Sequence, residues 1–263
     1  MTLTLYQVDA FTREVFRGNP AAVCPLTEWL PEEMMQRIAA ENNLSETAFF
    51  VPRGGDEYEI RWFTPTTEVP LCGHATLASS YVIFNCLGAK SDTVRFVTRE
   101  RGALSVTKQD DLLVLDFPAF GIEECEPPAG FIEALGRTPL QVWRAQGTWL
   151  MARFAEESDV AELTPDMAGL ARLSAREIIV TARGREADFV SRLFAPSIGI
   201  PEDPVTGAIH CALIPYWAKE LGKEKLYARQ LSARSGELFC ELAGERVKIG
   251  GHAVLYLKGE IYI

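Results

Sequence analysis

The sequence predicts an α+β fold made of two pseudo-symmetric halves, each a curved β-sheet or barrel wrapped around a central α-helix. The first observation is an internal repeat, because RWFTP at residues 61–65 returns as RLFAP at residues 192–196. The offset of 194 − 63 = 131 residues is close to half of the 263-residue chain. The second observation is that an almost wholly apolar stretch ending in glycine follows each copy, at residues 75–88 and 208–222. Two halves that close on each other predict one cleft with non-equivalent walls.

The two apolar stretches are predicted to be the central helices. They leave almost no polar face, which is typical of a helix buried on all sides. Pro215 lies inside the second stretch and is expected to kink it, because proline removes a backbone hydrogen bond. Strands are predicted at residues 3–8, 21–24, 48–51, 58–63, 94–97, 103–107 and 112–117 in the first half, and at residues 227–231, 238–242, 247–250, 253–257 and 261–263 in the second.

A surface helix is predicted in the first half, over residues 31–43. Pro31 suits a first helical turn, and Glu32 and Glu33 complement the helix dipole. Four apolar residues then form one stripe before two asparagines end the helix. A similar pattern over residues 164–173 predicts a counterpart in the second half.

Residues 118–130 are predicted to link the halves. This segment contains Pro118, adjacent prolines at positions 127 and 128, and several acidic or small residues, a composition typical of connecting segments. The predicted domains are therefore residues 1–118 and residues 131–263. A crossover of the last strands into the first domain is left open.

Composition indicates a soluble globular protein. Hydrophobic residues make up 48% and charged residues 24% of the chain, which is ordinary for globular proteins. No apolar run approaches the roughly 20 residues that span a bilayer, so no membrane association is expected. The N-terminus reads as a strand without the basic flank and apolar core of a signal peptide. A cytoplasmic location is therefore predicted.

The net charge and the positions of the cysteines and histidines limit the classes of ligand that the protein is expected to bind. The formal charge of −10 argues against nucleic acid, whose binding depends on neutralising phosphates. Six cysteines without a CxxC pair are expected to be reduced and buried. His74, His210 and His252 form no ligand-spaced cluster, and the chain contains no GxGxxG or P-loop. No metal and no cofactor are therefore predicted, and His210 is expected to be a packed core histidine.

The starts of the two central helices are candidate binding sites. The first turn of a helix has unpaired N–H groups and a partial positive charge, which suit a carboxylate. Gly73 and Gly207 would let these amides approach a ligand closely. The alternative is that each glycine only serves a tight turn between strand and helix. A small anionic molecule is the expected ligand.

His74 and Asp203 are polar residues at positions where apolar ones would pack better, so both are expected to face the cleft. The alternative is that Asp203 caps the second helix and that His74 is a turn histidine with its hydrogen bonds satisfied.

Glu46 lies between a predicted helix and the following predicted strand, in the segment SETAFF. A carboxyl group against such apolar neighbours would have a raised pKa and could act as a general acid/base. Its alternative is an exposed loop glutamate.

Cys72 at a helix start is a candidate proton-transferring thiol. The 131-residue offset aligns Pro70-Leu71-Cys72 with Pro201-Glu202-Asp203, so the partner of Cys72 in the repeat is predicted to be Asp203. A racemase of the two-thiol kind needs an acid on each face of the substrate carbon. One cysteine opposite one aspartate counts against that mechanism.

Four segments together resemble a known family. They are FRGNPAAV at residues 16–23, NLSETAF at 43–49, LCGHATLA at 71–78 and EDPVTG at 202–207, with further likeness at 228–238 and 250–251. They look like the phenazine-biosynthesis PhzF-like family, within the diaminopimelate epimerase-like fold. The resemblance implies a cofactor-free active site between two barrel-like halves, and a homodimer.

The resemblance also implies roles for individual residues. Glu46 would be the acid/base that moves a proton between substrate carbons, with His74 and Asp203 as polar partners. Ser45, Gly73 and Gly207 would line the pocket. In the best-known member the reaction is the isomerisation of a dihydro-hydroxyanthranilate.

The chain departs from the family at Ala208, where a serine usually follows Thr-Gly. The departure removes a hydroxyl from the site and argues against the phenazine substrate. Arg234, in the segment SARSG after the second central helix, is predicted to help hold an anionic substrate. The alternative is that Arg234 is a solvated hairpin arginine.

The predicted function is a cofactor-independent isomerase. The other candidates are a racemase or epimerase acting at an amino-acid-like carbon, and a non-catalytic ligand-binding protein.

Overall fold

The computed structural model describes residues 1–263, which form two compact units. The first unit comprises residues 1–117 and 248–263, and the second comprises residues 118–247. The C-terminal strands therefore belong with the N-terminal residues, and the predicted linker belongs to the second unit. The predicted division into residues 1–118 and 131–263, which left a crossover of the last strands open, differs from these units at residues 248–263.

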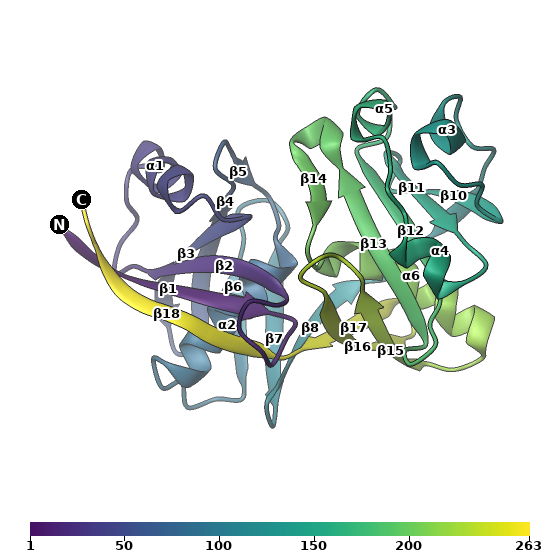
Figure 1. Cartoon of the computed structure of the whole chain (residues 1–263). Coiled ribbons are helices and arrows are strands. Elements are labelled where there is room, and N and C mark those ends of the chain that lie inside the picture. Colours follow the sequence, from purple (N-terminus) through teal and green to yellow (C-terminus); the bar gives the residue numbers. More distant parts are fainter. The chain divides into compact units, whose positions relative to one another are not determined.

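The first unit is built on a mixed sheet (Figure 1). Backbone pairing gives the order β18-β1-β2-β3-β4-β6-β7-β8, with β5 beside β4. All neighbours are antiparallel except β2 with β3 and β4 with β6, which are parallel. The strands are β1 (Thr2–Ala10), β2 (Asn19–Pro25), β3 (Glu46–Gly54), β4 (Glu57–Phe63), β5 (Glu68–Val69), β6 (Thr93–Val97), β7 (Ala103–Gln109), β8 (Leu112–Pro118) and β18 (Ala253–Tyr262).

The central helix of the first unit is α2 (Gly73–Asn85), which packs on β1, β2, β3 and β18. Ten of its 13 residues are buried, as the all-apolar pattern predicts. Four of the buried residues are polar, namely His74 and three hydroxyl residues. Thr76, Ser79 and Ser80 each donate a hydrogen bond to the carbonyl four residues earlier, at 2.6 to 2.8 Å. These bonds satisfy the hydroxyl groups inside the core.

The predicted surface helix is confirmed as α1 (Glu32–Asn42). Its apolar stripe, including Met35 and Ile38, packs with Phe49 and Phe63 of the sheet. The helix ends at Asn43, whose φ of +49° is a left-handed conformation that asparagine tolerates. The sheet of this unit therefore carries α1 and α2.

The second unit repeats this topology in the order β9-β10-β11-β12-β13-β15-β16, with β14 beside β13. The parallel neighbours are again two, β11 with β12 and β13 with β15. The sequence patterns did not indicate the strands between residues 141 and 195. The strands are β9 (Ile122–Glu124), β10 (Gln141–Ala145), β11 (Trp149–Arg153), β12 (Glu177–Arg183), β13 (Phe189–Ala195), β14 (Ile200–Asp203), β15 (Lys225–Gln230) and β16 (Gly236–Ala243). The next strand, β17 (Arg246–Gly251), begins in this unit, continues into the first and pairs with β8.

The second central helix is α6 (Gly207–Leu221), which continues through Pro215. The expected counterpart of α1 is broken into the five-residue helices α4 (Glu157–Ala161) and α5 (Met167–Ala171), which lie between the parallel strands β11 and β12 in the chain. Together with α3 (Phe131–Leu135) they enclose an apolar cluster on the sheet. No helix of the protein is long and apolar enough to cross a membrane.

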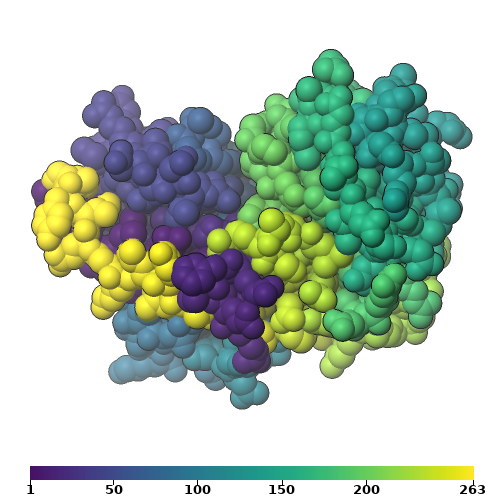
Figure 2. All heavy atoms as spheres, viewed as in Figure 1, coloured from purple at the N-terminus to yellow at the C-terminus, as the bar shows by residue number.

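In each unit, the strand beside the first strand of the repeat lies outside the predicted domain boundaries. In the first unit β18 runs along the whole of β1, from Thr2 opposite Tyr262 to Ala10 opposite Ala253. The two chain ends consequently lie together, and Figure 2 shows the C-terminal residues in yellow at the surface of this unit. In the second unit β9, which lies inside the predicted linker, pairs with β10. The predicted linker therefore contains a strand at residues 122–124.

The structure also corrects the alignment of the two repeats. The offset is 131 for Arg61 and Arg192, but it becomes 134 at the helix starts Gly73 and Gly207 (207 − 73 = 134). The residue that precedes α2 is Cys72, and the one that precedes α6 is Thr206. Cys72 therefore corresponds to Thr206, and the predicted pairing of Cys72 with Asp203 is wrong.

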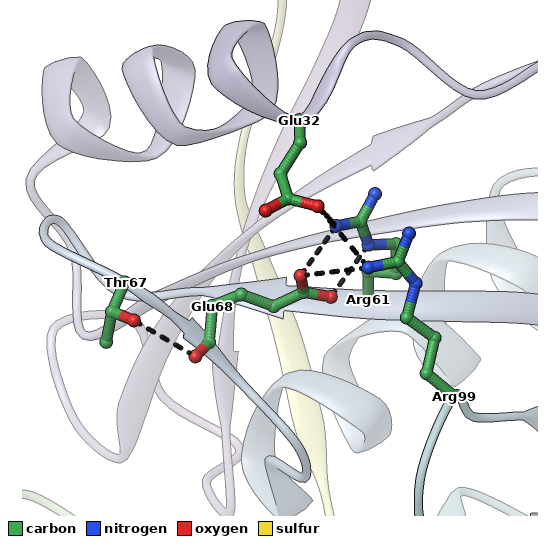
Figure 3. Close-up of polar contacts among 5 residues, drawn as sticks. All are labelled: Glu32, Arg61, Thr67, Glu68 and Arg99. Carbon is green, nitrogen blue, oxygen red and sulfur yellow. Dashed lines mark hydrogen bonds and ion pairs between the residues drawn. The ribbon is translucent and has the colours of Figure 1, made fainter.

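In each unit, an arginine–glutamate ion pair joins the two strands that precede the central helix. Arg61 in β4 binds both carboxylate oxygens of Glu68 in β5, at 2.7 and 2.5 Å, and also contacts Glu32 at the start of α1 (Figure 3). Arg192 in β13 binds both carboxylate oxygens of Glu202 in β14, at 2.7 and 3.0 Å. Paired contacts of this kind fix geometry as well as charge.

Candidate active site

Glu46 and His74 are brought together by the packing of α2 on β3. Glu46 is the first residue of β3, and His74 is the second residue of α2. The Nε2 atom of His74 lies 3.2 Å from Oε2 of Glu46. The two side chains are only 6% and 12% exposed, respectively. Glu46 is therefore no exposed loop glutamate, and a carboxyl group and an imidazole share one nearly enclosed place.

His74 is neutral at pH 7, because burial lowers its pKa to about 3. The Nδ2 atom of Asn19 lies 3.2 Å from Nδ1 of His74. An amide nitrogen can only donate, so Nδ1 accepts and the ring proton resides on Nε2. This tautomer carries the N–H group on the side of the Glu46 carboxylate, where the 3.2 Å contact does not have the geometry of a hydrogen bond.

Asn19 was missed as a site residue by the sequence analysis, although it lies in the first of the four family segments. It is the first residue of β2 and is completely buried. The turn before it requires Gly18, whose φ is +64° and where a Cβ atom would lie 2.1 Å from the carbonyl oxygen of Ala10. Phe16, with a φ of +70°, donates its backbone N–H to the Asp9 carboxylate at 2.9 Å. The tight loop thereby directs Asn19 toward His74.

Cys72 lies on the same edge of the imidazole as Asn19. Its Sγ atom is 3.4 Å from Nδ1 of His74, and the residue is 7% exposed. One ligand atom each from Glu46, Cys72 and His74 lie within 4.8 Å of one another. The sequence analysis considered only the three histidines as a metal cluster and so missed this combination.

Asp203 is held by groups of its own unit. The hydroxyl of Thr206 donates to the Asp203 carboxylate, and Nε2 of Gln230 donates to the Asp203 carbonyl at 2.8 Å. Gln230 also accepts from the backbone N–H of Thr206 at 2.9 Å and is completely buried. Asp203 is not the N-cap of α6, because Thr206 occupies that position. The capping alternative is therefore wrong.

The ion pair between Arg192 and Glu202 anchors the residue before Asp203. Arg192 is 11% exposed, and its guanidinium also donates to the carbonyls of Val160 and Leu163 at 3.1 and 2.8 Å. The β14 strand is thus tied to β13 on one side and, through Gln230, to β15 on the other. These contacts fix the backbone from which the Asp203 carboxylate projects.

The remaining predicted site residues lie at the expected places in the chain. Ser45 directly precedes β3, and Gly73, Gly207 and Ala208 lie in the first turns of the two central helices. Arg234 is half-buried in the turn between β15 and β16. Their contact with a substrate stays a prediction, as does the expectation that the two helix starts face one cleft.

The core role predicted for His210 is confirmed. The residue is completely buried in α6, and burial lowers its pKa to about 4. Its ring lies 5.8 Å from the ring of Phe189, and Nδ1 bonds the carbonyl of Thr206 at 2.8 Å. His210 is therefore a neutral packing residue.

Comparisons with known proteins show the family of the chain. The PhzC-PhzF family model, described as phenazine biosynthesis-like protein, matches residues 8–259. An uncharacterized isomerase of Pseudomonas aeruginosa is 51% identical over 263 residues, covering 100% of both chains. A human phenazine biosynthesis-like domain-containing protein is 38% identical, covering 99% of each chain.

Solved structures extend the likeness to the fold. The crystal structure of a PhzF family protein from Enterococcus faecalis has a TM-score of 0.96 and 47% identity, covering 100% of both chains. A hydroxyproline epimerase from Agrobacterium vitis has a TM-score of 0.61 at 10% identity, covering 99% of this chain and 91% of that one. The second match shows a shared fold alone.

Proposed function

The chain belongs to the phenazine biosynthesis-like (PhzC-PhzF) family, and from this premise we propose that it moves a proton between two carbons of a small carboxylated molecule without a cofactor. The enzyme class predicted from the sequence, isomerase, is confirmed by the close relatives. Glu46 is the proposed general acid/base. The observation that carries the proposal is the nearly enclosed contact between the Glu46 carboxylate and His74.

The proposed reaction uses Glu46 twice. Its carboxylate removes a proton from one substrate carbon and returns the proton to another. The side chain is 12% exposed, so little water competes with substrate for the carboxylate. His74 is neutral, so its Nε2 N–H can orient the carboxylate without adding the positive charge that would weaken the base. The residue thus acts as a positioning partner.

Substrate recognition is assigned to the helix starts and to the second unit. The amides near Gly73 and Gly207 would bind a carboxylate, since helix N-termini attract anions. The Asp203 carboxylate accepts from the Thr206 hydroxyl, and the Asp203 backbone carbonyl accepts from Gln230. The carboxylate would accept further hydrogen bonds from a hydroxyl or amino group of the substrate. Arg234 would contribute positive charge. Ser45 and Ala208 are proposed to contact the substrate.

The proposal includes a homodimer in the cytoplasm, as the family resemblance implies. The phenazine precursor is not the proposed substrate, because Ala208 offers no hydroxyl at the start of α6. Small cyclic or aromatic carboxylates are the class that fits an anion-binding helix start beside an acid/base.

The experiment begins with a thermal-shift screen of cyclic and aromatic carboxylates, because a ligand that binds only the folded state raises its melting temperature. Each hit is then incubated with the enzyme in D2O. Turnover should place deuterium on the carbon that receives the proton, as the Glu46 carboxyl exchanges with solvent. Conversion of every hit without any solvent deuterium, and with full activity in Glu46→Gln, would overturn the assignment.

A second candidate is a racemase acting at an amino-acid-like carbon. It is favoured by the 3.4 Å contact between Cys72 Sγ and His74 Nδ1, which places a thiol beside a base. The equivalent residue in the second unit is Thr206, so a second thiol is missing. Solvent exchange at the α-carbon of amino acids would identify this activity. Ligand binding with no chemical change would instead identify a non-catalytic binding protein.

A further inference from the structure

The edge of His74 that faces Cys72 has the dimensions of a zinc site. The Sγ and Nδ1 atoms are 3.4 Å apart. With Zn–S and Zn–N bonds of about 2.3 and 2.0 Å, two ligands of a tetrahedral ion are separated by about 3.5 Å. Cys72 and His74 could therefore bind one ion between them without moving apart.

The opposite edge of the imidazole has a carboxylate within 3.2 Å, close enough to accept the ring N–H once the ring turns toward it, although the contact is not a hydrogen bond in this structure. A metal-bound histidine almost always donates its other ring N–H to a carboxylate or carbonyl. Here Nε2 lies 3.2 Å from the Glu46 carboxylate. Glu46 is not a ligand in this arrangement, because it faces Nε2 while Cys72 faces Nδ1. It orients the ring and makes Nδ1 a better donor to the ion.

Asn19 can complete the protein ligands. Its amide lies 3.2 Å from Nδ1 and is completely buried. A half-turn of the amide exchanges its nitrogen and oxygen, and the oxygen would then point to the place between Nδ1 and Sγ. Three protein ligands and one open position are the arrangement of zinc sites that keep a water molecule.

We propose that Cys72, His74 and Asn19 bind a zinc ion at the start of α2, with Glu46 holding the imidazole. On binding, the thiol of Cys72 loses its proton to solvent and its sulfur bonds the ion. The start of a helix favours the thiolate. The small exposure of Cys72, 7%, leaves an approach for the ion. Zinc would also keep substrate from the Glu46–His74 pair; this consequence, unlike the binding itself, rests on the proposed function.

The test is a calorimetric titration of the reduced full-length protein with Zn2+ alone. One equivalent should bind, with release of about one proton, because only the thiol must be deprotonated. Cys72→Ser and His74→Asn should each weaken binding more than 100-fold. Glu46→Gln should weaken it by about 10-fold to 100-fold, as expected for loss of a carboxylate that supports a ligand. Cys86→Ser, which removes a thiol at the other end of α2, should bind zinc as the unaltered protein does.

A second measurement needs no variant. Zinc should protect Cys72 from alkylation by iodoacetamide while leaving Cys86 reactive, as mapped by peptide mass spectrometry. Co2+ in place of Zn2+ should give a sulfur-to-cobalt charge-transfer absorption that Cys72→Ser lacks. The proposal is overturned if no stoichiometric binding occurs, if binding survives both Cys72→Ser and His74→Asn, or if zinc leaves Cys72 alkylation unchanged. Because no substrate is used, none of these outcomes depends on the proposed isomerase activity.

Discussion

Thr76 and His210 occupy the same position in the two central helices. Thr76 donates its hydroxyl to the carbonyl of Cys72 at 2.6 Å, and His210 bonds the carbonyl of Thr206 through Nδ1 at 2.8 Å. In each case the carbonyl belongs to the residue that precedes the helix. One repeat therefore satisfies this carbonyl with a group that does not titrate, and the other with a histidine.

This difference predicts an acid-dependent loss of stability. Burial lowers the pKa of His210 from 6.5 to about 4. Between these values the unfolded state binds a proton that the folded state does not, so the free energy of unfolding falls as the pH drops from about 6.5 to about 4. The slope per histidine is about 1.4 kcal/mol per pH unit. His210→Thr, which copies Thr76, should reduce this slope in urea unfolding measured at pH 7, 5.5 and 4.5. An unchanged slope in the variant would show that His210 does not stay neutral.

Glu46→Gln should lower turnover by about 10²- to 10⁴-fold, the usual contribution of a positioned acid/base. The substitution keeps the shape of the side chain and removes the group that carries the proton. The rate constant is measured with a substrate from the carboxylate screen. Glu41→Gln, an exposed position in α1, is the matched control and should remain fully active. Nearly full turnover in Glu46→Gln would exclude the proposed role.

Cys72→Ser should keep most of the isomerase activity in the absence of zinc. The thiol is not the proposed proton carrier, and the equivalent position in the second unit holds Thr206 rather than a second cysteine. Steady-state kinetics in a chelating buffer provide the measurement. If turnover disappears while the circular dichroism spectrum is unchanged, the racemase candidate gains support.

Gln230→Leu should destabilise the protein by about 1–3 kcal/mol, because the substitution leaves the Thr206 N–H and the Asp203 carbonyl without their buried partner. Urea unfolding measures the change. Gln109→Leu, at an exposed position of β7, should alter stability by no more than about 0.5 kcal/mol. Equal effects of the two substitutions would mean that Gln230 does not hold the Asp203 segment.

Ala208→Ser should improve activity on the dihydro-hydroxyanthranilate, on which the unaltered protein is expected to act poorly. A serine at the start of α6 would offer a hydroxyl to a polar group of the substrate, and an unpaired buried group costs about 1–3 kcal/mol. Product formation by both proteins is compared directly. Efficient conversion by the unaltered protein would show that Ala208 does not set specificity.

The sequence predicted the duplicated fold because the relevant signals are local. An all-apolar helix and alternating strands can be read within short windows, and α1, α2, α6 and the predicted strands of the first half are present. The strands between residues 141 and 195 were not indicated. The structure has two five-residue helices, α4 and α5, where one helix was predicted over residues 164–173. Each is too short to show more than one turn of a helical pattern.

Some residues of the candidate site were indicated by the sequence, and others were not. The family segments pointed to Glu46 and His74, which lie 3.2 Å apart in the structure, while their catalytic roles stay predictions. No pattern indicated that Asn19 and Cys72 would meet the other edge of the same imidazole, or that Gln230 would hold Asp203. Asn19 is 55 positions from His74, and Gln230 is 27 positions from Asp203. Only the packing of separate strands and helices brings these residues together.

The sequence by itself determined the family, the duplication and the residue types available for proton transfer. The tertiary structure alone decided that β18 closes the first unit and β9 the second, and that the repeat offset changes from 131 to 134 between Arg192 and Gly207. It also decided that Cys72 corresponds to Thr206. Strand pairing depends on hydrogen bonds between segments that are distant in the chain, and local composition does not record which distant segment will supply them.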